Sequence, residues 1–149
     1  PGSIYHAISQ LEAQGLITPT ESAGGQKLGP AKTEYALTDS GQEEFVRLLE
    51  GALRDINLIE LSVGVVFMEF LSRQRVLELL HERVVAQQQV PEFLATLPTE
   101  ENPTTPSKHP ELIRLWSESY TSAALSTERL IEALQSGKYA FQTKEEPTP

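Results

Sequence analysis

The 149-residue sequence contains no cysteine, which excludes disulfide bonds, thiolate metal sites and thiol nucleophiles together. It also lacks an apolar run of the roughly 18 residues needed for a membrane helix. Its first ten residues do not have the basic and apolar regions of a signal peptide. Because missing cysteine also suits a reducing compartment, we expect a soluble chain that stays in the cytoplasm, with no membrane partner.

Basic residues are scarce, since 12 lysines and arginines stand against 21 aspartates and glutamates and give a formal net charge of -9. This balance argues against binding nucleic acid by bulk electrostatics, because phosphate contacts need cationic side chains. The charge is unevenly distributed, however. Residues 1–32 contain two acidic residues, Glu12 and Glu21, beside Lys27 and Lys32, so the acidity belongs mainly to the later part of the chain.

The spacings typical of catalysis or metal binding are also missing. The three histidines, His6, His81 and His109, are far apart, and none stands at a metal-ligand spacing. We find no nucleophile with a positioned base. The Glu-Arg pairs at 82–83 and 128–129 do not face each other on a helix and are interpreted as solvated surface. We therefore expect no enzyme activity, no metal and no cofactor.

The first part of the chain predicts a helix followed by a β-hairpin. Residues 3–14 have helical periodicity, and Gly15 follows at a natural C-cap position. Short strands are expected at 16–18 and 33–38, on either side of a polar, glycine-containing loop at 19–31. The apolar face of the first helix consists of Ile4, Ala7, Ile8 and Leu11.

The later part of the chain predicts helices alone. The apolar segment 58–71 is long enough to favour a buried helix over a strand. An amphipathic helix is expected over 72–97, where Pro91 predicts a kink or a restart. After a proline-rich linker at 98–110, the helix 111–135 has a nearly heptad-like stripe made of Leu112, Leu115, Trp116, Ala123, Leu130, Ile131 and Leu134.

These patterns predict a mainly α fold with a small β-hairpin, in two modules. Thr38 or Asp39 is the expected N-cap of a helix that closes the first module, at residues 1–55. The second module, 56–137, is all helical, and its apolar stripes need more partners than its own helices supply. The remaining residues, 138–149, are predicted to be a disordered tail.

Two strings of residues in the first module have a specific order and separation. One is PGSIYHAI at 1–8, continued by Leu11 and by GLI at 15–17. The other is GPAKTEYALTDSG at 29–41. Together they resemble the PadR-like transcriptional regulators, a family with a winged helix-turn-helix DNA-binding domain and a C-terminal helical dimerisation domain. The downstream helices fit this family in pattern only.

The resemblance implies that the first string is the recognition helix running into the wing, and that the second is the wing's return strand and the entry to the next helix. It also implies two further helices before the recognition helix, so that an incomplete N-terminus would expose Ile4, Ile8 and Leu11. The family commonly has an arginine near Ala31 and Lys32, where this chain offers one lysine, which contacts phosphate less rigidly than a bidentate arginine.

The outward face of such a helix carries polar side chains that could contact DNA. A helix fits the major groove, where glutamine pairs with adenine, while tyrosine and serine hydroxyls hold phosphates. On spacing alone, an ordinary solvated helix face and a plain connecting hairpin explain the same residues. With the resemblance, we expect DNA contacts from Ser3, Tyr5, His6, Ser9, Gln10 and, on the wing, Lys27 and Lys32.

Four aromatic residues of the helical module, Phe67, Phe70, Trp116 and Tyr120, allow two interpretations. Aromatic residues at helical spacing are usually core. Alternatively, they line a dimer seam or a pocket for a small hydrophobic or aromatic effector, as the resemblance implies for some members.

The sequence thus predicts a homodimeric regulator, a repressor, that binds double-stranded DNA at a palindromic operator and is released by an effector. Two other classes remain open. The acidic balance favours a helical protein-interaction adaptor whose winged helix does not bind DNA. A small-molecule binder without a role in DNA binding is the third.

Overall fold

The computed structural model describes residues 2–20, 33–97, 110–139 and 141. The fold is mainly helical with one two-stranded antiparallel sheet, as the sequence predicted. The chain divides into two compact units, Pro1–Leu48 and Leu49–Pro149. The division lies within helix α2 (Asp39–Arg54), whose end is close to the module boundary expected near residue 55.

The first unit begins with helix α1 (Gly2–Ala13), which ends in a Schellman motif. Gly15 has a φ of 71°, a conformation that glycine adopts without steric cost. The Gly15 N–H donates to the carbonyl of Glu12, and the Leu16 N–H donates to the carbonyl of Leu11, both at 2.9 Å. These bonds use carbonyls at the helix end and turn the chain into the hairpin.

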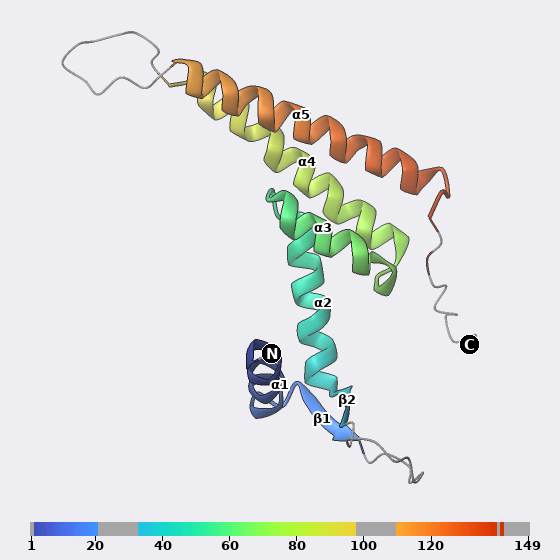
Figure 1. Ribbon diagram of the computed structural model, residues 1–149. Helices are drawn as coiled ribbons and strands as arrows, with labels where there is room; N and C mark the ends of the chain where they lie inside the picture. The colour runs from blue at the N-terminus through green and yellow to red at the C-terminus, as the bar shows by residue number, and fades with distance from the viewer. Residues whose placement is uncertain (1, 21–32, 98–109, 140, 142–149) are drawn as a thin grey trace, which may run out of the picture. The chain divides into compact units, whose positions relative to one another are not determined.

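The hairpin consists of β1 (Ile17–Thr20) and β2 (Glu34–Leu37), as Figure 1 shows. Ile17 pairs with Leu37, and Pro19 pairs with Tyr35. The predicted end of the first strand at Thr18 was wrong, because Pro19 and Thr20, expected in the loop, belong to β1. A two-stranded sheet has only edge strands, where a proline without an N–H is tolerated.

Of the two predicted N-cap residues of α2, Thr38 and Asp39, the structure has Thr38. Its hydroxyl oxygen accepts a hydrogen bond from the Gly41 N–H at 3.0 Å, and the hydroxyl donates to the Gly15 carbonyl at 2.6 Å. The Thr38 N–H also donates to the Leu16 carbonyl at 3.0 Å. One threonine therefore joins the end of α1 to the start of α2.

The second unit contains helix α3 (Leu58–Phe67), which is continued by a 3-10 turn, η1 (Met68–Phe70). The Asn57 side chain caps α3 by accepting from the Ile59 N–H at 2.8 Å. The helix was correctly predicted, but its burial was not. Leu61 and Gly64 are its buried residues, and the position of a Cβ at Gly64 would lie 3.0 Å from Leu53 of α2. Met68 of η1 is also buried, and Val65 and Leu71 are half-buried. The other apolar residues of the run are exposed, namely Leu58, Ile59, Val63, Val66, Phe67 and Phe70.

Helix α4 (Arg73–Ala95) continues through Pro91, so the predicted restart does not occur. Proline removes the N–H that would bond to the carbonyl four residues earlier, a loss of about 3 kcal/mol in an isolated helix. Leu94, which follows the proline, is 4% exposed. Tertiary packing of the last turn offsets the missing bond.

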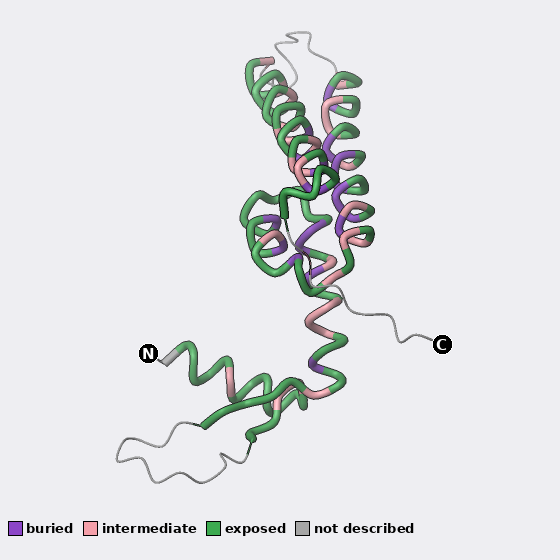
Figure 2. The backbone as a smooth tube through the Cα atoms, turned by 90° about the vertical axis from the view of Figure 1, so that its right-hand side faces the viewer, coloured by how far each residue is buried: buried purple, intermediate pink, exposed green. Residues whose placement is uncertain are grey.

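Helix α5 (Pro110–Gln135) packs along α4, and Figure 2 shows the buried residues on the inward sides of these two helices. On α5 the buried positions are Ala124, Thr127, Ile131 and Leu134, with heptad spacing. The predicted stripe was therefore wrong in its first half, where Leu112, Leu115 and Trp116 are exposed. Small residues, not the large apolar ones, face α4 at the middle of α5.

Arg73 at the start of α4 contacts the chain that follows α5. Its guanidinium donates to the carbonyls of Leu134 and Tyr139, each at 2.9 Å, and lies 5.1 Å from the ring centroid of Phe141. Tyr139 and Phe141 were expected in a disordered tail, but both contact Arg73. Lys138 of the predicted tail is also described, and residues 140 and 142–149 lie outside the described part of the chain.

An ion pair joins α2 to α4 and predicts a pH dependence of stability. Arg75 donates to both oxygens of Glu50, at 2.8 and 2.7 Å. These bonds hold the pKa of Glu50 below its ordinary value of 4.5. A lowered pKa in the folded state stabilises the protein above pH 4.5, and this contribution is lost as the pH falls through the folded-state value.

We therefore expect Glu50→Gln to lower the melting temperature at pH 7 and to have little effect at pH 3. Thermal unfolding of both proteins between these values measures the difference. A melting-temperature gap that stays constant over this range would contradict the role given to the Glu50 charge.

Candidate functional site

The polar face of α1 is exposed in the first unit. All five residues predicted on this face are exposed, and Tyr5 is 74% exposed. Within the part of the chain that the structure describes, none of their side chains has a hydrogen-bond or ion-pair partner. They are therefore available to contact another molecule. The residues are Ser3, Tyr5, His6, Ser9 and Gln10.

The apolar face of α1 is also largely uncovered within the described residues. Ile4 is 67% exposed and Leu11 is 39% exposed, while Ile8 is half-buried. Burial alone does not distinguish the two faces. Their chemistry does, because one carries hydroxyl, imidazole and amide groups and the other carries aliphatic groups.

The junction of the first unit fixes the direction in which α1 leaves the hairpin. Gly41 is buried at this junction, and a Cβ there would overlap the carbonyl oxygen of Leu16 and approach its carbon to 2.9 Å. With the Thr38 bonds described above, this close approach packs the chain between α1 and β1 against the first turn of α2. The polar face of α1 is thus positioned by backbone contacts.

Charge within the described part of the first unit is mostly negative. Its acidic residues outnumber its cationic ones, and Arg47 is the one lysine or arginine among the described residues of this unit. Arg47 donates to Glu44 at 2.6 and 2.7 Å, and this pairing lowers the pKa of Glu44. The two lysines predicted to contact phosphates, Lys27 and Lys32, lie outside the described residues.

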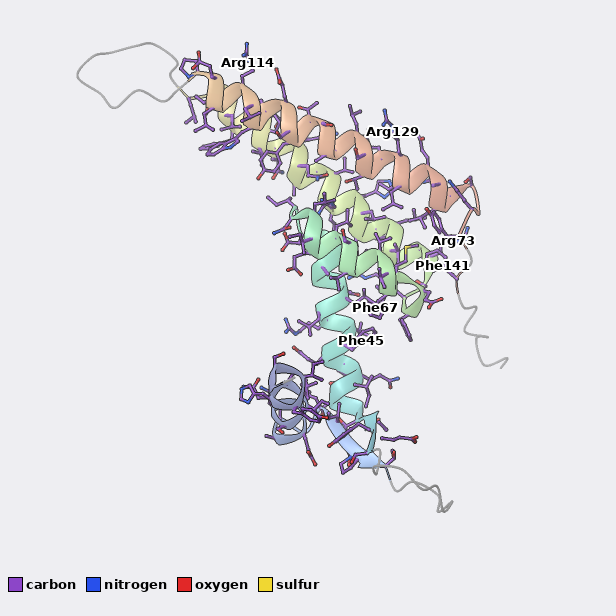
Figure 3. All side chains as sticks on the ribbon, in the orientation of Figure 1. Phe45, Phe67, Arg73, Arg114, Arg129 and Phe141 are labelled. Atoms are coloured by element: carbon purple, nitrogen blue, oxygen red, sulfur yellow. The ribbon has the colours of Figure 1, made fainter. Side chains whose placement is uncertain are left out.

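The four aromatic residues predicted at a dimer seam or effector pocket lie in two parts of the second unit, two on α3 and η1 and two on α5. Phe67 and Phe70 are close to each other, with ring centroids 6.5 Å apart and an interplanar angle of 43°, and Figure 3 labels Phe67. On α5, Trp116 is exposed and Tyr120 is half-buried. None of the four lines the cavity that lies among α3, α4 and α5 in the described part of this unit.

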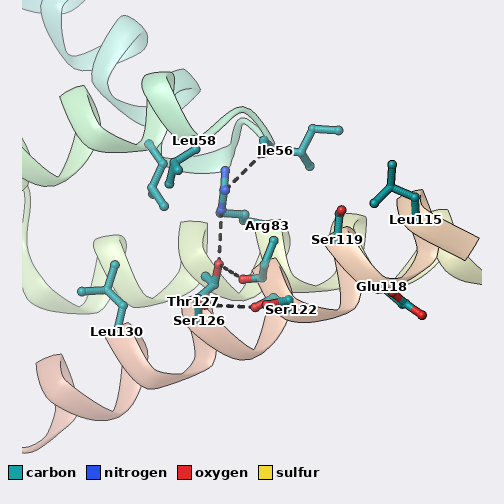
Figure 4. Close-up of a pocket in the computed structure, with 12 residues that line it drawn as sticks. Ile56, Leu58, Arg83, Leu115, Glu118, Ser119, Ser122, Ser126, Thr127 and Leu130 are labelled. Carbon is teal, nitrogen blue, oxygen red and sulfur yellow. Dashed lines mark hydrogen bonds between the residues drawn. The ribbon is translucent and has the colours of Figure 1, made fainter. Parts of the chain in front are cut away.

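That cavity has a volume of about 700 Å³ and lies among α3, α4 and α5 (Figure 4). Its apolar lining comes from Ile56, Leu58, Leu61, Leu115, Ala123 and Leu130. Its polar lining comes from Arg83, Glu118, Ser119, Ser122, Ser126 and Thr127. A concave, mainly apolar surface with a few convergent polar groups is typical of small-molecule sites.

Arg83 was expected on a solvated surface, and this interpretation was wrong. The residue is 2% exposed. Its Nε donates to the Thr127 hydroxyl oxygen at 3.3 Å, and one terminal nitrogen donates to the Ile56 carbonyl at 3.2 Å. The other terminal nitrogen is buried without a hydrogen-bond partner among the described residues. Arg83 continues the helical spacing of the core residues Val76, Leu79 and Leu80. This spacing could have predicted its burial, but its charge suggested a surface position.

The chemistry around Arg83 is polar but carries no directly paired negative charge. Thr127 donates to the side-chain oxygen of Gln87 at 3.1 Å, and Gln87 is fully buried with an amide nitrogen that has no partner in the described chain. Burial lowers the pKa of Arg83, and the charge of Asp55 partly opposes this effect. Among the described residues, no carboxylate lies within 4.0 Å of the Arg83 guanidinium.

Helix α1, the two-stranded wing and the glycine-dependent entry into α2 are the parts of a winged-helix unit. Residues 1–47 match the model of the transcriptional regulator PadR-like family, which confirms the predicted resemblance over this unit. This family consists of transcriptional regulators. No curated protein matches the chain. Within the described residues, no helix has the length and apolarity to cross a membrane.

Proposed function

We propose that this chain is a homodimeric repressor that binds a palindromic DNA operator through the first unit. The observation that carries this proposal is the family match over residues 1–47, together with a polar α1 face whose side chains have no partner within the described chain. On this proposal α1 enters the major groove, where Gln10 pairs with a base edge and Tyr5 contacts a phosphate. Lys27 and Lys32 contribute further phosphate contacts from the wing.

Homodimer formation is supported by the exposed apolar side of α3. Ile59, Val63 and Val66 stand at i, i+4 and i+7 and are 72%, 49% and 70% exposed. A row of this kind is unfavourable in water, and a second copy of the chain provides a matching row. Two-fold pairing would present two recognition helices to half-sites about 34 Å apart, which is one turn of DNA.

Repression would end when an effector bound to the helical unit disfavours the DNA-bound arrangement. The coupling is reciprocal, so an effector that weakens DNA binding must itself bind the DNA complex less tightly. A ligand with equal affinity for the free and DNA-bound dimer would contradict this part of the proposal. A regulator of transcription would act in the cytoplasm, which remains the proposed location.

A second candidate function is a protein-interaction adaptor that keeps the winged helix without binding DNA. It is favoured by the acidic character of the described first unit, where Arg47 is the one lysine or arginine. The two functions differ in their response to salt, because phosphate contacts release counterions and make DNA affinity fall steeply with added salt.

Substitutions on α1 test the proposed reading of DNA. A duplex selected from a random library by the full chain serves as the ligand, and fluorescence anisotropy measures its affinity. We expect Gln10→Ala to weaken binding by about tenfold or more and to relax selectivity at one base pair, because a bidentate base contact discriminates by about 1–3 kcal/mol. Tyr5→Phe, which removes the hydroxyl alone, should weaken all sequences equally.

Gln89→Ala is the matched control, since Gln89 is exposed on α4 in the second unit. Its affinity should equal that of the unsubstituted chain. If the Gln10 and Gln89 variants behave alike, α1 does not read DNA. If no duplex is enriched at low salt, the adaptor becomes the better account.

A further inference from the structure

The cavity among α3, α4 and α5 contains a buried positive charge, Arg83, that has no carboxylate within 4.0 Å among the described residues. Asp55 acts on it only from a greater distance. Arginine stays protonated in proteins, so burial cannot be relieved by loss of the proton. A buried charge is costly unless it is paired and its hydrogen bonds are satisfied. Two donating nitrogens of Arg83 reach Thr127 and Ile56, and both of these partners are uncharged. The third nitrogen has no partner within the described chain.

The residues around Arg83 indicate which chemical group could accept a hydrogen bond from its guanidinium. Figure 4 shows the guanidinium between the carbonyl of Ile56 and the hydroxyl of Thr127, at the wall of the cavity. Leu58 and Leu130 provide apolar lining beside it. Glu118 is the acidic residue among the lining groups, but its side chain is 71% exposed and lies 3.9 Å from Arg114 on the surface. Its charge is directed to solvent and not to Arg83.

We infer that this cavity binds an amphipathic organic anion, with a carboxylate on Arg83 and an apolar body along the leucines. This names the chemical class of the effector proposed above and rests on that function for its regulatory meaning. A carboxylate matches the planar guanidinium and would accept from the unpartnered nitrogen. The volume of about 700 Å³ holds a small ligand, and the exposed Leu58 and Leu115 mark where the cavity meets solvent.

Octanoate and 1-octanol are suitable probes, because they share an apolar chain and differ in charge. Isothermal titration calorimetry of the full chain, without DNA, measures both affinities. We expect octanoate to bind at least about tenfold more tightly than the alcohol, since hydrogen bonds between charged groups are about twice as strong as neutral ones. Equal affinities, or no octanoate binding, would overturn the inference.

Arg83→Met is the decisive variant, because it keeps an apolar side chain of similar length and removes the charge. Replacing a buried charge by an apolar residue is often tolerated by the fold. The variant should lose the preference for octanoate and bind it about tenfold more weakly. Arg129→Met removes an equal charge from an exposed position of α5, labelled in Figure 3, and should leave octanoate affinity within about twofold. Equal behaviour of the two variants would contradict the site.

Ser126→Leu provides an independent test if the Arg83 variant does not fold, as judged by circular dichroism. Ser126 is exposed on α5 and lines the cavity, so a leucine fills space without changing the charge of Arg83. Octanoate affinity should fall while the melting temperature is kept, and an unchanged affinity would overturn the site. Because these experiments contain no DNA, they fail or succeed independently of the proposed operator binding.

Discussion

Gly41→Ala is expected to disrupt the first unit, although alanine is the better helix former. The added Cβ would overlap the backbone carbonyl of Leu16, and the Leu37 side chain lies 3.2 Å from the same position. Backbone cannot move aside as a flexible side chain does, so we expect a loss of about 2–3 kcal/mol in the free energy of unfolding of this unit. The position of α1 relative to the wing would be lost with it.

Gly51→Ala is a matched control in the same helix. Gly51 is exposed, and a Cβ there would meet nothing within 4 Å. Helix propensity alone then acts, and it should stabilise the protein by up to about 1 kcal/mol. Amide hydrogen exchange at residues 16–20 and 34–38 reports on the first unit directly. Faster exchange in the Gly41 variant and unchanged exchange in the Gly51 variant is the predicted result, and equal exchange in both would contradict the close approach.

Val66→Asp is expected to convert the proposed dimer into a monomer. The residue is 70% exposed in the single chain, so the substitution leaves the packing of α3 against α2 intact. In a dimer that covers the Ile59–Val63–Val66 row, an unpaired carboxylate would be desolvated at the seam. We expect dimer affinity to fall by at least about a hundredfold, since leaving a charge buried without a partner costs several kcal/mol.

Val85→Asp is the control for this experiment, because Val85 is 53% exposed on α4 and lies outside that row. Sedimentation velocity of the three proteins gives their masses over a range of concentrations. The unsubstituted chain and the Val85 variant should sediment as dimers and the Val66 variant as a monomer. If all three proteins form dimers of equal affinity, the dimer interface does not include the Ile59–Val63–Val66 row. If the unsubstituted chain is a monomer, the proposed dimer is wrong.

Local signals made the first unit predictable. Gly15 after a helical period and Thr38 before the next helix each determine a turn through bonds to near neighbours in sequence. The hairpin follows because its strands are joined by a single loop. The first strand was misplaced at both ends, since it runs from Ile17 to Thr20. Pro19 and Thr20 were assigned to the loop because strand pairing depends on the partners Tyr35 and Glu34 and not on the preference of proline for loops.

Long-range packing explains what the sequence did not predict in the second unit. An apolar run such as 58–71 indicates that the segment avoids water, but not whether the same chain covers it. The result was a helix with one buried side and one exposed side. The polar contacts of Arg83, Gln87 and Thr127 were missed for the opposite reason. Periodicity by residue type assigns charged and polar residues to the surface, although these three pack between α4 and α5.

Sequence-specific binding of DNA is the central claim, and its most direct measurement is an affinity comparison on the unsubstituted chain. Fluorescence anisotropy would compare the selected duplex with a scrambled duplex of equal length, at 50 mM and 200 mM salt. The account predicts that the selected duplex binds at least about a thousandfold more tightly at a given salt concentration and that both affinities fall as salt is added. Equal affinity for the two duplexes, or affinities that do not change with salt, would contradict it.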